Sequence, residues 1–165
     1  MKKLIFIRHG KAEDPVPEIS DFERSLTLKG KIIAKTMAQR LIEKEKSLGI
    51  IVTSPAFRAL ETAFIFAGEF GSDTENIILN NALYYKMNLQ NLSGILANIE
   101  EAAETLTMFG HNPSFTQMAN SLSREGCDFI PKNGIVCISF NISTWPEIGR
   151  NNGKMEYFLK PDKEL

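Results

Sequence analysis

The sequence predicts a three-layer α/β/α domain whose central sheet is mostly parallel. Short apolar segments that are typical of strands alternate with amphipathic segments that are typical of helices along most of the chain. This alternation indicates parallel strands joined by helical crossovers, which cover both faces of the sheet. A chain of 165 residues has the size of one domain, so we expect a single domain over residues 1–165.

The first strand is expected at residues 3–7, which run directly into Arg8-His9-Gly10. Gly10 and the polar, proline-containing residues 11–17 end this strand in a loop. The loop leads to a helix of roughly five turns, because Ile33, Met37 and Leu41 recur at every fourth position. Polar residues occupy the other faces of that helix.

The later segments continue the same alternation. The β-branched residues 50–52 predict a second strand, and Ser54 and Pro55 are expected as the N-cap and first residue of a helix that ends near Ala67. The remaining expected elements are a short strand near 77–79, a helix over 89–101, a strand ending at 109, a helix over 113–122, and two antiparallel strands at 135–142 and 155–159.

The bulk composition excludes several classes of protein. The net charge is −1, so no overall field attracts nucleic acid or an anionic membrane. Cys127 and Cys137 do not form a Cys-x-x-Cys pair, so neither a zinc site nor a redox motif is indicated. The apolar run after Lys2 is too short for a secretory signal, and no uncharged segment approaches the roughly 18 residues that span a bilayer. We therefore expect a cytoplasmic protein with no nucleic-acid or membrane partner.

The two histidines of the chain both follow predicted strands. His9 follows residues 3–7 and stands beside Arg8, and His111 follows the strand that ends at residue 109. The carboxyl ends of the strands lie at one edge of the sheet, where open α/β proteins bind ligands. Arg58, near the start of the helix after the second strand, opens onto the same edge. The sequence therefore predicts one site that contains these four residues.

In order along the chain, three motifs resemble the histidine phosphatase superfamily, which also contains the cofactor-dependent phosphoglycerate mutases. The motifs are Arg8-His9-Gly10, Ser54-Pro55-x-x-Arg58-Ala59-x-x-Thr62 and Gly110-His111. The segment Asp21-x-x-Arg24-x-Leu26-Thr27-x-x-Gly30 also resembles the short bacterial phosphohistidine phosphatases, so the resemblance covers most of the chain. It implies a phosphoglycerate mutase-like fold.

The resemblance implies a metal-independent phosphatase that works through a phosphohistidine intermediate on His9. The planar fork of arginine suits the oxygens of a phosphoryl group, so Arg8 and Arg58 would hold the phosphate beside Gly10. The same two positive charges should lower the pKa of His9 and keep it neutral and nucleophilic. The resemblance further implies that His111 donates a hydrogen bond to the phosphoryl oxygens. We expect no metal and no cofactor.

The sequence departs from the superfamily where many members carry a carboxylate acid, because residues 81–88 contain no Asp or Glu. Glu13 and Asp14, in the loop after His9, are the nearest candidates for a general acid, and Tyr84 or Tyr85 would be a weaker donor. An alkoxide leaves poorly unless it is protonated, whereas an imidazole is readily protonated near neutrality. The missing carboxylate therefore favours phosphohistidine over serine phosphates or sugar phosphates.

We expect the substrate to be a phosphorylated protein such as a histidine phosphotransfer domain, because so short a chain has little material to cap the site. Two alternatives stay open: a phosphatase of the same superfamily for small phosphorylated molecules, and an inactive relative that only binds phosphorylated ligands. Retention of His9 argues against the inactive relative. For Arg24, lining the pocket and pairing with Asp21 or Glu23 are both open, and we favour the pairing.

Overall fold

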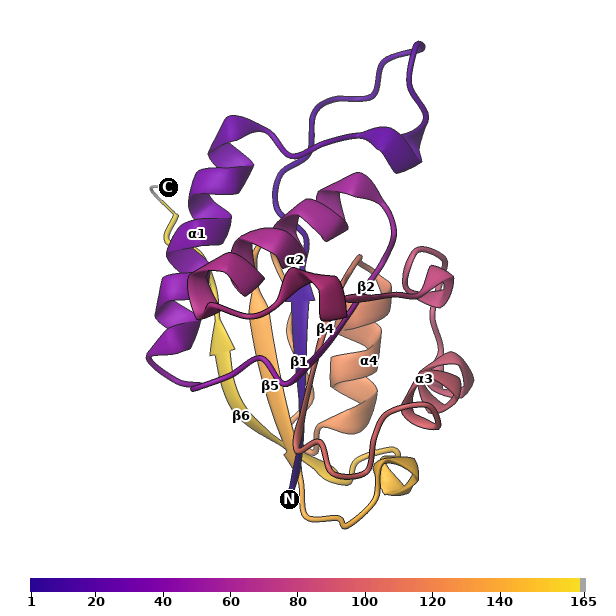
Figure 1. Ribbon diagram of the computed structural model, residues 1–165. Coiled ribbons are helices and arrows are strands. Elements are labelled where there is room, and N and C mark those ends of the chain that lie inside the picture. Colours follow the sequence, from indigo (N-terminus) through magenta and orange to yellow (C-terminus); the bar gives the residue numbers. More distant parts are fainter. Residues whose placement is uncertain (164–165) are drawn as a thin grey trace.

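The computed structural model describes residues 1–163 as a six-stranded sheet with helices on both faces (Figure 1). The strands are β1 (Lys2–Arg8), β2 (Ile50–Thr53), β3 (Ile78–Leu79), β4 (Thr105–Gly110), β5 (Ile135–Phe140) and β6 (Gly153–Leu159). The helices are α1 (Leu28–Ile42), α2 (Phe57–Phe70), α3 (Leu89–Leu96) and α4 (Ser114–Leu122), and short 3-10 helices include η1 (Asp21–Glu23) and η3 (Asn81–Leu83).

The sheet has the order β3-β2-β4-β1-β5-β6. β4 pairs in parallel with both β1 and β2, and β2 pairs in parallel with β3. β5 runs antiparallel to β1, and β6 runs antiparallel to β5. The prediction of a mostly parallel sheet closed by an antiparallel pair is therefore confirmed.

β1 lies at the centre of the sheet and contributes to the core on both faces. Ile5 and Ile7 pack with residues of α1 and α2, whereas Leu4 and Phe6 pack with residues of α3 and α4. Successive side chains of a strand point to opposite faces, so a strand covered on both sides is apolar throughout. This explains why residues 4–7 form an unbroken apolar run, and all four are fully buried. Within residues 1–163, no helix is long and apolar enough to cross a membrane.

The loop between β1 and α1 is held closely against the start of that helix. The backbone N–H of Thr27 donates to the carbonyl of Lys11 at 2.9 Å, and the N–H of Glu13 donates to Ser25 at 2.8 Å. The Thr27 side chain caps α1 by accepting from the N–H of Gly30 at 2.9 Å. A Cβ at Gly30 would collide with the Lys11 carbonyl. The Leu26-Thr27-x-x-Gly30 motif thus fixes the base of this loop.

Three helices differ from the sequence prediction. Ser54 is not an N-cap, because α2 begins at Phe57 and its N-cap is Ala56. The Ser54 hydroxyl instead contacts His111, at 2.8 Å. α1 begins after Thr27 as expected but spans 15 residues, about four turns rather than five, because it ends at Ile42. The helix predicted over residues 89–101 ends at Leu96.

Candidate active site

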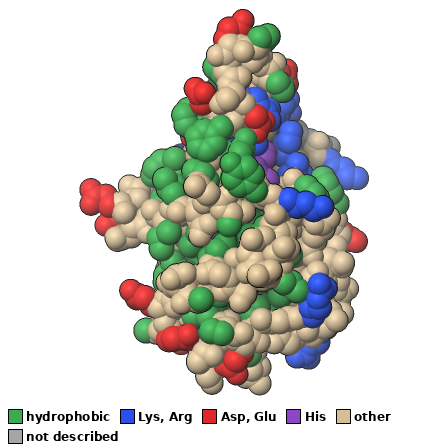
Figure 2. Space-filling view, turned by 90° about the vertical axis from the view of Figure 1, so that its right-hand side faces the viewer, with side chains coloured by type: hydrophobic (Ala, Val, Ile, Leu, Met, Phe, Trp, Pro, Cys, Tyr) green, Lys and Arg blue, Asp and Glu red, His purple; other side chains and the backbone are tan. Residues whose placement is uncertain are grey.

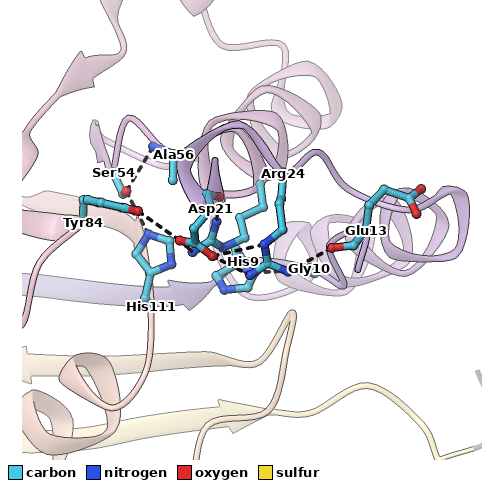
Figure 3. Close-up of polar contacts among 10 residues, drawn as sticks. His9, Gly10, Glu13, Asp21, Arg24, Ser54, Ala56, Tyr84 and His111 are labelled. Atoms are coloured by element: carbon cyan, nitrogen blue, oxygen red, sulfur yellow. Dashed lines mark hydrogen bonds and ion pairs between the residues drawn. The ribbon is translucent and has the colours of Figure 1, made fainter. Parts of the chain in front are cut away.

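The four predicted site residues, Arg8, His9, Arg58 and His111, come together at the carboxyl ends of the central strands. Figure 3 shows two of them, His9 and His111, side by side. Arg8 is the last residue of β1, and the N–H of His9 donates to the carbonyl of Gly110 at the end of β4, at 3.0 Å. The rings of His9 and His111 are 4.9 Å apart between centroids. The parallel pairing of β1 with β4 therefore places the two histidines side by side, as the sequence predicted.

His9 is fixed by a backbone carbonyl and is almost entirely buried, with 8% of its surface exposed. Its Nδ1 lies 2.7 Å from the carbonyl oxygen of Gly10. A carbonyl can only accept, so the proton of a neutral His9 ring is on Nδ1 and the lone pair is on Nε2. Burial, assisted by the charges of His111, Arg58 and Arg8, lowers the pKa of His9 to about 3. His9 is therefore neutral at pH 7, with burial rather than the arginines as the main cause.

His111 is held through its Nε2, whereas His9 is held through its Nδ1. Its Nε2 lies 2.8 Å from the hydroxyl of Ser54, which is fully buried and already accepts from the N–H of Ala56 at 3.3 Å. Within residues 1–163 the Ser54 proton then has His111 Nε2 as its acceptor, which leaves the His111 proton on Nδ1. Burial and the nearby Arg58 lower the pKa of His111 to about 4. A neutral ring with a free Nδ1–H can donate to a ligand.

Arg58 is anchored by one edge of its guanidinium. Nη1 donates to the backbone carbonyl of Asp21 at 2.7 Å, and Nη2 donates to the Asp21 carboxylate at 3.0 Å. Thr62, one turn along α2, donates to the Arg58 carbonyl at 2.6 Å and accepts from the N–H of Gly10 at 3.1 Å. The Nε of Arg58 is buried without a partner among the described residues. That edge of the guanidinium remains available to a ligand.

Arg8 is anchored by a carbonyl and an aromatic ring. Nη1 donates to the carbonyl of Ile130 at 3.0 Å, and the guanidinium carbon lies 5.2 Å from the centre of the Phe129 ring. Within the part of the chain that the structure describes, its Nε is also buried and unpartnered. Buried donors without a partner are rare in native proteins, so two of them on arginines beside His9 indicate the place of an anionic ligand.

Asp21 was expected only as part of a motif and as a pairing partner of Arg24, but it also contacts two other residues of the site. Its carboxylate accepts from Arg24 Nε and Nη2 at 3.1 and 2.8 Å, from Arg58 at 3.0 Å, and from the Tyr84 hydroxyl at 2.9 Å. Burial opposes its ionisation, but these hydrogen bonds outweigh burial and hold the pKa of Asp21 well below its usual range. The pairing role favoured for Arg24 agrees with these contacts. Asp21 in turn joins the loop to α2 and to Tyr84.

The structure does not bring the two candidate acids to the histidines. Asp14 and Glu13 are exposed, and the Glu13 side chain points away from His9 (Figure 3). The backbone carbonyl of Glu13, rather than its carboxylate, accepts from Arg24 at 2.9 Å. Tyr84 lies closer, with its ring 5.8 Å from that of His111, but its hydroxyl donates to Asp21.

Comparison with known proteins agrees with this geometry. Residues 4–120 match the model of the histidine phosphatase superfamily, branch 1. An uncharacterized protein of Picosynechococcus is 32% identical over 123 residues, which are 73% of this chain and 73% of that protein. The matched residues include all three motifs that carried the resemblance, so the family expected from the sequence is confirmed.

Solved structures confirm the fold. The protein histidine phosphatase SixA in complex with tungstate matches with a TM-score of 0.82 and 19% identity, covering 96% of this chain and 97% of that chain. A protein from Nakamurella multipartitia named as phosphohistidine phosphatase SixA matches with a TM-score of 0.80 and 19% identity, covering 97% and 96%. A mycobacterial glucosyl-3-phosphoglycerate phosphatase with inorganic phosphate matches with a TM-score of 0.66 and 13% identity, covering 95% and 96%. The chain thus has the phosphoglycerate mutase-like fold and belongs to branch 1 of the histidine phosphatase superfamily.

Proposed function

We propose that the protein hydrolyses phosphohistidine in proteins, without a metal, through a phosphohistidine intermediate on His9. One observation carries this proposal: the neutral His9 keeps its Nε2 lone pair free beside two arginines whose buried Nε donors have no partner among residues 1–163. A nucleophile and cationic donors around one point are what phosphoryl transfer needs.

The first step transfers the phosphoryl group from the substrate to His9. The Nε2 lone pair forms a bond to phosphorus while the bond from phosphorus to the substrate nitrogen breaks, and the electron pair returns to that nitrogen. A substrate imidazole that is protonated on its second nitrogen leaves as a neutral molecule, so no dedicated acid is required. Arg8, Arg58 and the His111 Nδ1–H donate to the phosphoryl oxygens, where charge is concentrated.

The second step returns the enzyme to its starting state. Water forms a bond to phosphorus while the bond to His9 Nε2 breaks, which restores the lone pair and releases inorganic phosphate. The Gly10 carbonyl holds the Nδ1 proton throughout, at 2.7 Å, so the ring keeps its orientation through both steps.

The surroundings of the histidines support a phosphoramidate over a phosphate ester. The carboxylate of Asp21 acts electrostatically on His111, and its low pKa keeps it ionised and unable to protonate an alkoxide. The Tyr84 hydroxyl donates its proton to that same carboxylate. The likeness in fold to proteins named as phosphohistidine phosphatases points the same way. A substrate whose leaving group needs no acid fits this site best.

The test is a substrate panel read together with a trapping experiment. Phosphohistidine, phosphoserine, phosphotyrosine and sugar phosphates are offered to one enzyme preparation in EDTA, and kcat/KM is compared. Acid quenching of a reaction with a labelled phosphohistidine peptide is expected to trap phosphate on the protein as an acid-labile, alkali-stable adduct.

His9→Ala should lose both the adduct and the turnover, and the exposed Gln90→Ala on α3 should lose neither. A phosphoserine or sugar phosphate with kcat/KM equal to that of phosphohistidine would contradict the substrate. Activity that survives His9→Ala, or that EDTA removes, would contradict the mechanism.

A further inference from the structure

A groove of about 450 Å³ lies directly beside Arg8, which forms part of its lining. Its lining is apolar at the centre and basic at the rim, and consists of Arg8, Lys11, Ile33, Phe129, Pro131, Lys132, Asn133 and Pro161. We name it the Phe129 groove. The reactions described above do not use this groove, although it shares Arg8 with the phosphate site.

Phe129 is a large aromatic residue that is mostly exposed to solvent. Its surface is 65% exposed, yet its ring lies 5.2 Å from the guanidinium carbon of Arg8. The next residue, Ile130, is fully buried, and its carbonyl accepts from Arg8 at 3.0 Å and from Asn112 at 2.9 Å. Phe129 is thus held in place through Ile130, whose hydrogen bonds go to Arg8 and Asn112, the sequence neighbours of His9 and His111. An exposed aromatic fixed at the edge of a site is typical of a surface that contacts a partner.

Positive charge gathers at the same rim. Burial, followed by the charges of Arg8, Lys11 and Arg24, lowers the pKa of Lys132, which shows how closely these cations stand. The negative charge of Asp14 acts in the opposite direction on Lys132. The whole chain has a net charge of −1, so this concentration of cations is local. Figure 2 shows Lys and Arg side chains on one side of the histidines and hydrophobic side chains on the other.

The opposite wall of the site is aromatic. Phe22 packs against Phe57 and Tyr84, with ring centroids 5.9 and 5.5 Å apart, and Tyr84 packs against Tyr85 at 5.2 Å. The two walls therefore differ in charge, and a substrate with an uneven distribution of charge would bind in one orientation. Complementary charge sets orientation and association rate more than it sets affinity.

We propose that the Phe129 groove binds the residues that flank the phosphohistidine of an acidic protein substrate. An apolar side chain of the substrate packs between Phe129 and Pro131, and carboxylates of the substrate lie beside Lys132 and Lys11. This inference rests on the proposed function and names its substrate class. A small phosphoramidate fills the phosphate site alone and does not reach the groove.

Kinetics with three substrates test the inference. These are phosphoimidazole, a phosphohistidine peptide flanked by Glu and Leu, and a phosphohistidine peptide flanked by Lys and Leu. At low salt we expect kcat/KM for the acidic peptide to exceed that for the basic peptide by roughly tenfold, and about 0.5 M salt to remove the difference. Lys132→Glu should lower kcat/KM for the acidic peptide by roughly tenfold, through KM, and leave phosphoimidazole unchanged.

Lys46→Glu is the matched control, because it makes the same charge change beside Met1 and Thr105 at the opposite end of the sheet. Equal kcat/KM for the two peptides at low salt would overturn the inference. So would an equal loss with phosphoimidazole in Lys132→Glu, since the lysine would then act at the reacting centre.

A binding experiment separates this inference from the proposed function. Fluorescence anisotropy of the same two peptides without phosphate measures the groove whether or not any phosphoramidate is hydrolysed. The acidic peptide should bind more tightly than the basic peptide to the native protein, and Lys132→Glu should abolish the difference. Absence of hydrolysis with this preference present would reject the proposed function alone, whereas equal binding of both peptides would reject the groove.

Discussion

The two histidines of this protein carry their proton on the same ring nitrogen but offer opposite chemistry. In His9 the Nδ1–H is bonded to the Gly10 carbonyl, so the lone pair on Nε2 is free. In His111 the lone pair on Nε2 is bonded to the Ser54 hydroxyl, and the Nδ1–H has no partner among residues 1–163. In the mechanism that we propose, one ring is thereby the nucleophile and the other a hydrogen-bond donor. Two histidines with the same tautomer can therefore differ in chemistry, because each offers a ligand only the ring nitrogen that is not hydrogen-bonded to the protein.

Replacing each histidine in turn by glutamine should have the largest effects and should distinguish the two roles. His9→Gln removes the nucleophile, so turnover should fall by more than about 10³-fold and no phosphoenzyme should form. His111→Gln keeps an N–H donor, so we expect a loss of roughly 10- to 100-fold with the phosphoenzyme still formed. Acid-quench trapping with a labelled phosphohistidine peptide measures both. Equal loss of the phosphoenzyme in the two variants would contradict the division of roles.

Arg58→Ala tests whether the unpartnered donors beside the histidines hold the phosphoryl group. Removing one charge-stabilising donor should lower kcat by at least about 10²-fold, because the interaction strengthens as charge develops in the transition state. The exposed Arg150 gives the control, since Arg150→Ala removes the same charge at a distance from the site. Steady-state kinetics with phosphoimidazole measures the loss. A loss confined to KM would contradict the prediction, because it would show that Arg58 binds the substrate and the transition state equally strongly.

The two low pKa values predict how stability depends on pH. An unfolded histidine takes up a proton near its ordinary pKa of about 6.5, whereas the folded His9 and His111 do so only near about 3 and about 4. Below pH 6.5 the unfolded state therefore binds more protons, and stability falls as pH falls towards the folded values. Each histidine contributes a loss of roughly 2 kcal/mol between pH 6.5 and pH 5.

Urea unfolding at pH 6.5 and pH 5 measures this loss. His9→Gln and His111→Gln should each remove about half of it, and the double variant should remove nearly all. A loss that is the same in the native protein and in the double variant would show that these histidines are not kept neutral by the fold.

Ser54→Ala should have the smallest effect and sharpens the comparison. Without the hydroxyl, His111 Nε2 has no donor, so the proton redistributes between the two ring nitrogens and kcat falls roughly three- to tenfold. ¹⁵N NMR of the histidine side chains should show the Nδ1–H tautomer of His111 lost in Ser54→Ala, retained in Ser54→Thr, and unchanged for His9. An unaltered His111 tautomer in Ser54→Ala would show that the Ser54 hydroxyl does not determine the tautomer of His111.

The position of the site could be predicted from the sequence because its residues follow strand ends. Arg8 and His111 are placed by where β1 and β4 stop, and parallel pairing of those strands brings them together without any detail of packing. The same reasoning failed for Ser54, because a serine before a proline resembles an N-cap whatever its hydroxyl contacts. Its actual partner, His111, lies 57 residues further along the chain.

Two further features could not be read from the sequence because they depend on contacts between distant segments. The Asp21 carboxylate meets Arg58 and Tyr84, which lie 37 and 63 residues further along the chain. Only the Arg24 contact is local enough to be foreseen from spacing. Likewise the low pKa of His9 comes mainly from burial, and sequence alone indicated the neighbouring arginines but not how completely the ring is covered.

Asp21 joins the loop to Arg58, so we expect the loop and the proposed phosphate site to be coupled energetically. Asp21 holds one edge of Arg58, and a bound phosphoryl group would hold the other, so each contact favours the arginine orientation that the other needs. Such coupling is reciprocal, since a ligand that stabilises the loop must bind more tightly when the loop is stable. Inorganic phosphate or tungstate should therefore slow hydrogen exchange and proteolysis throughout residues 11–27. Mutations in this loop that never touch the phosphate should still change its affinity.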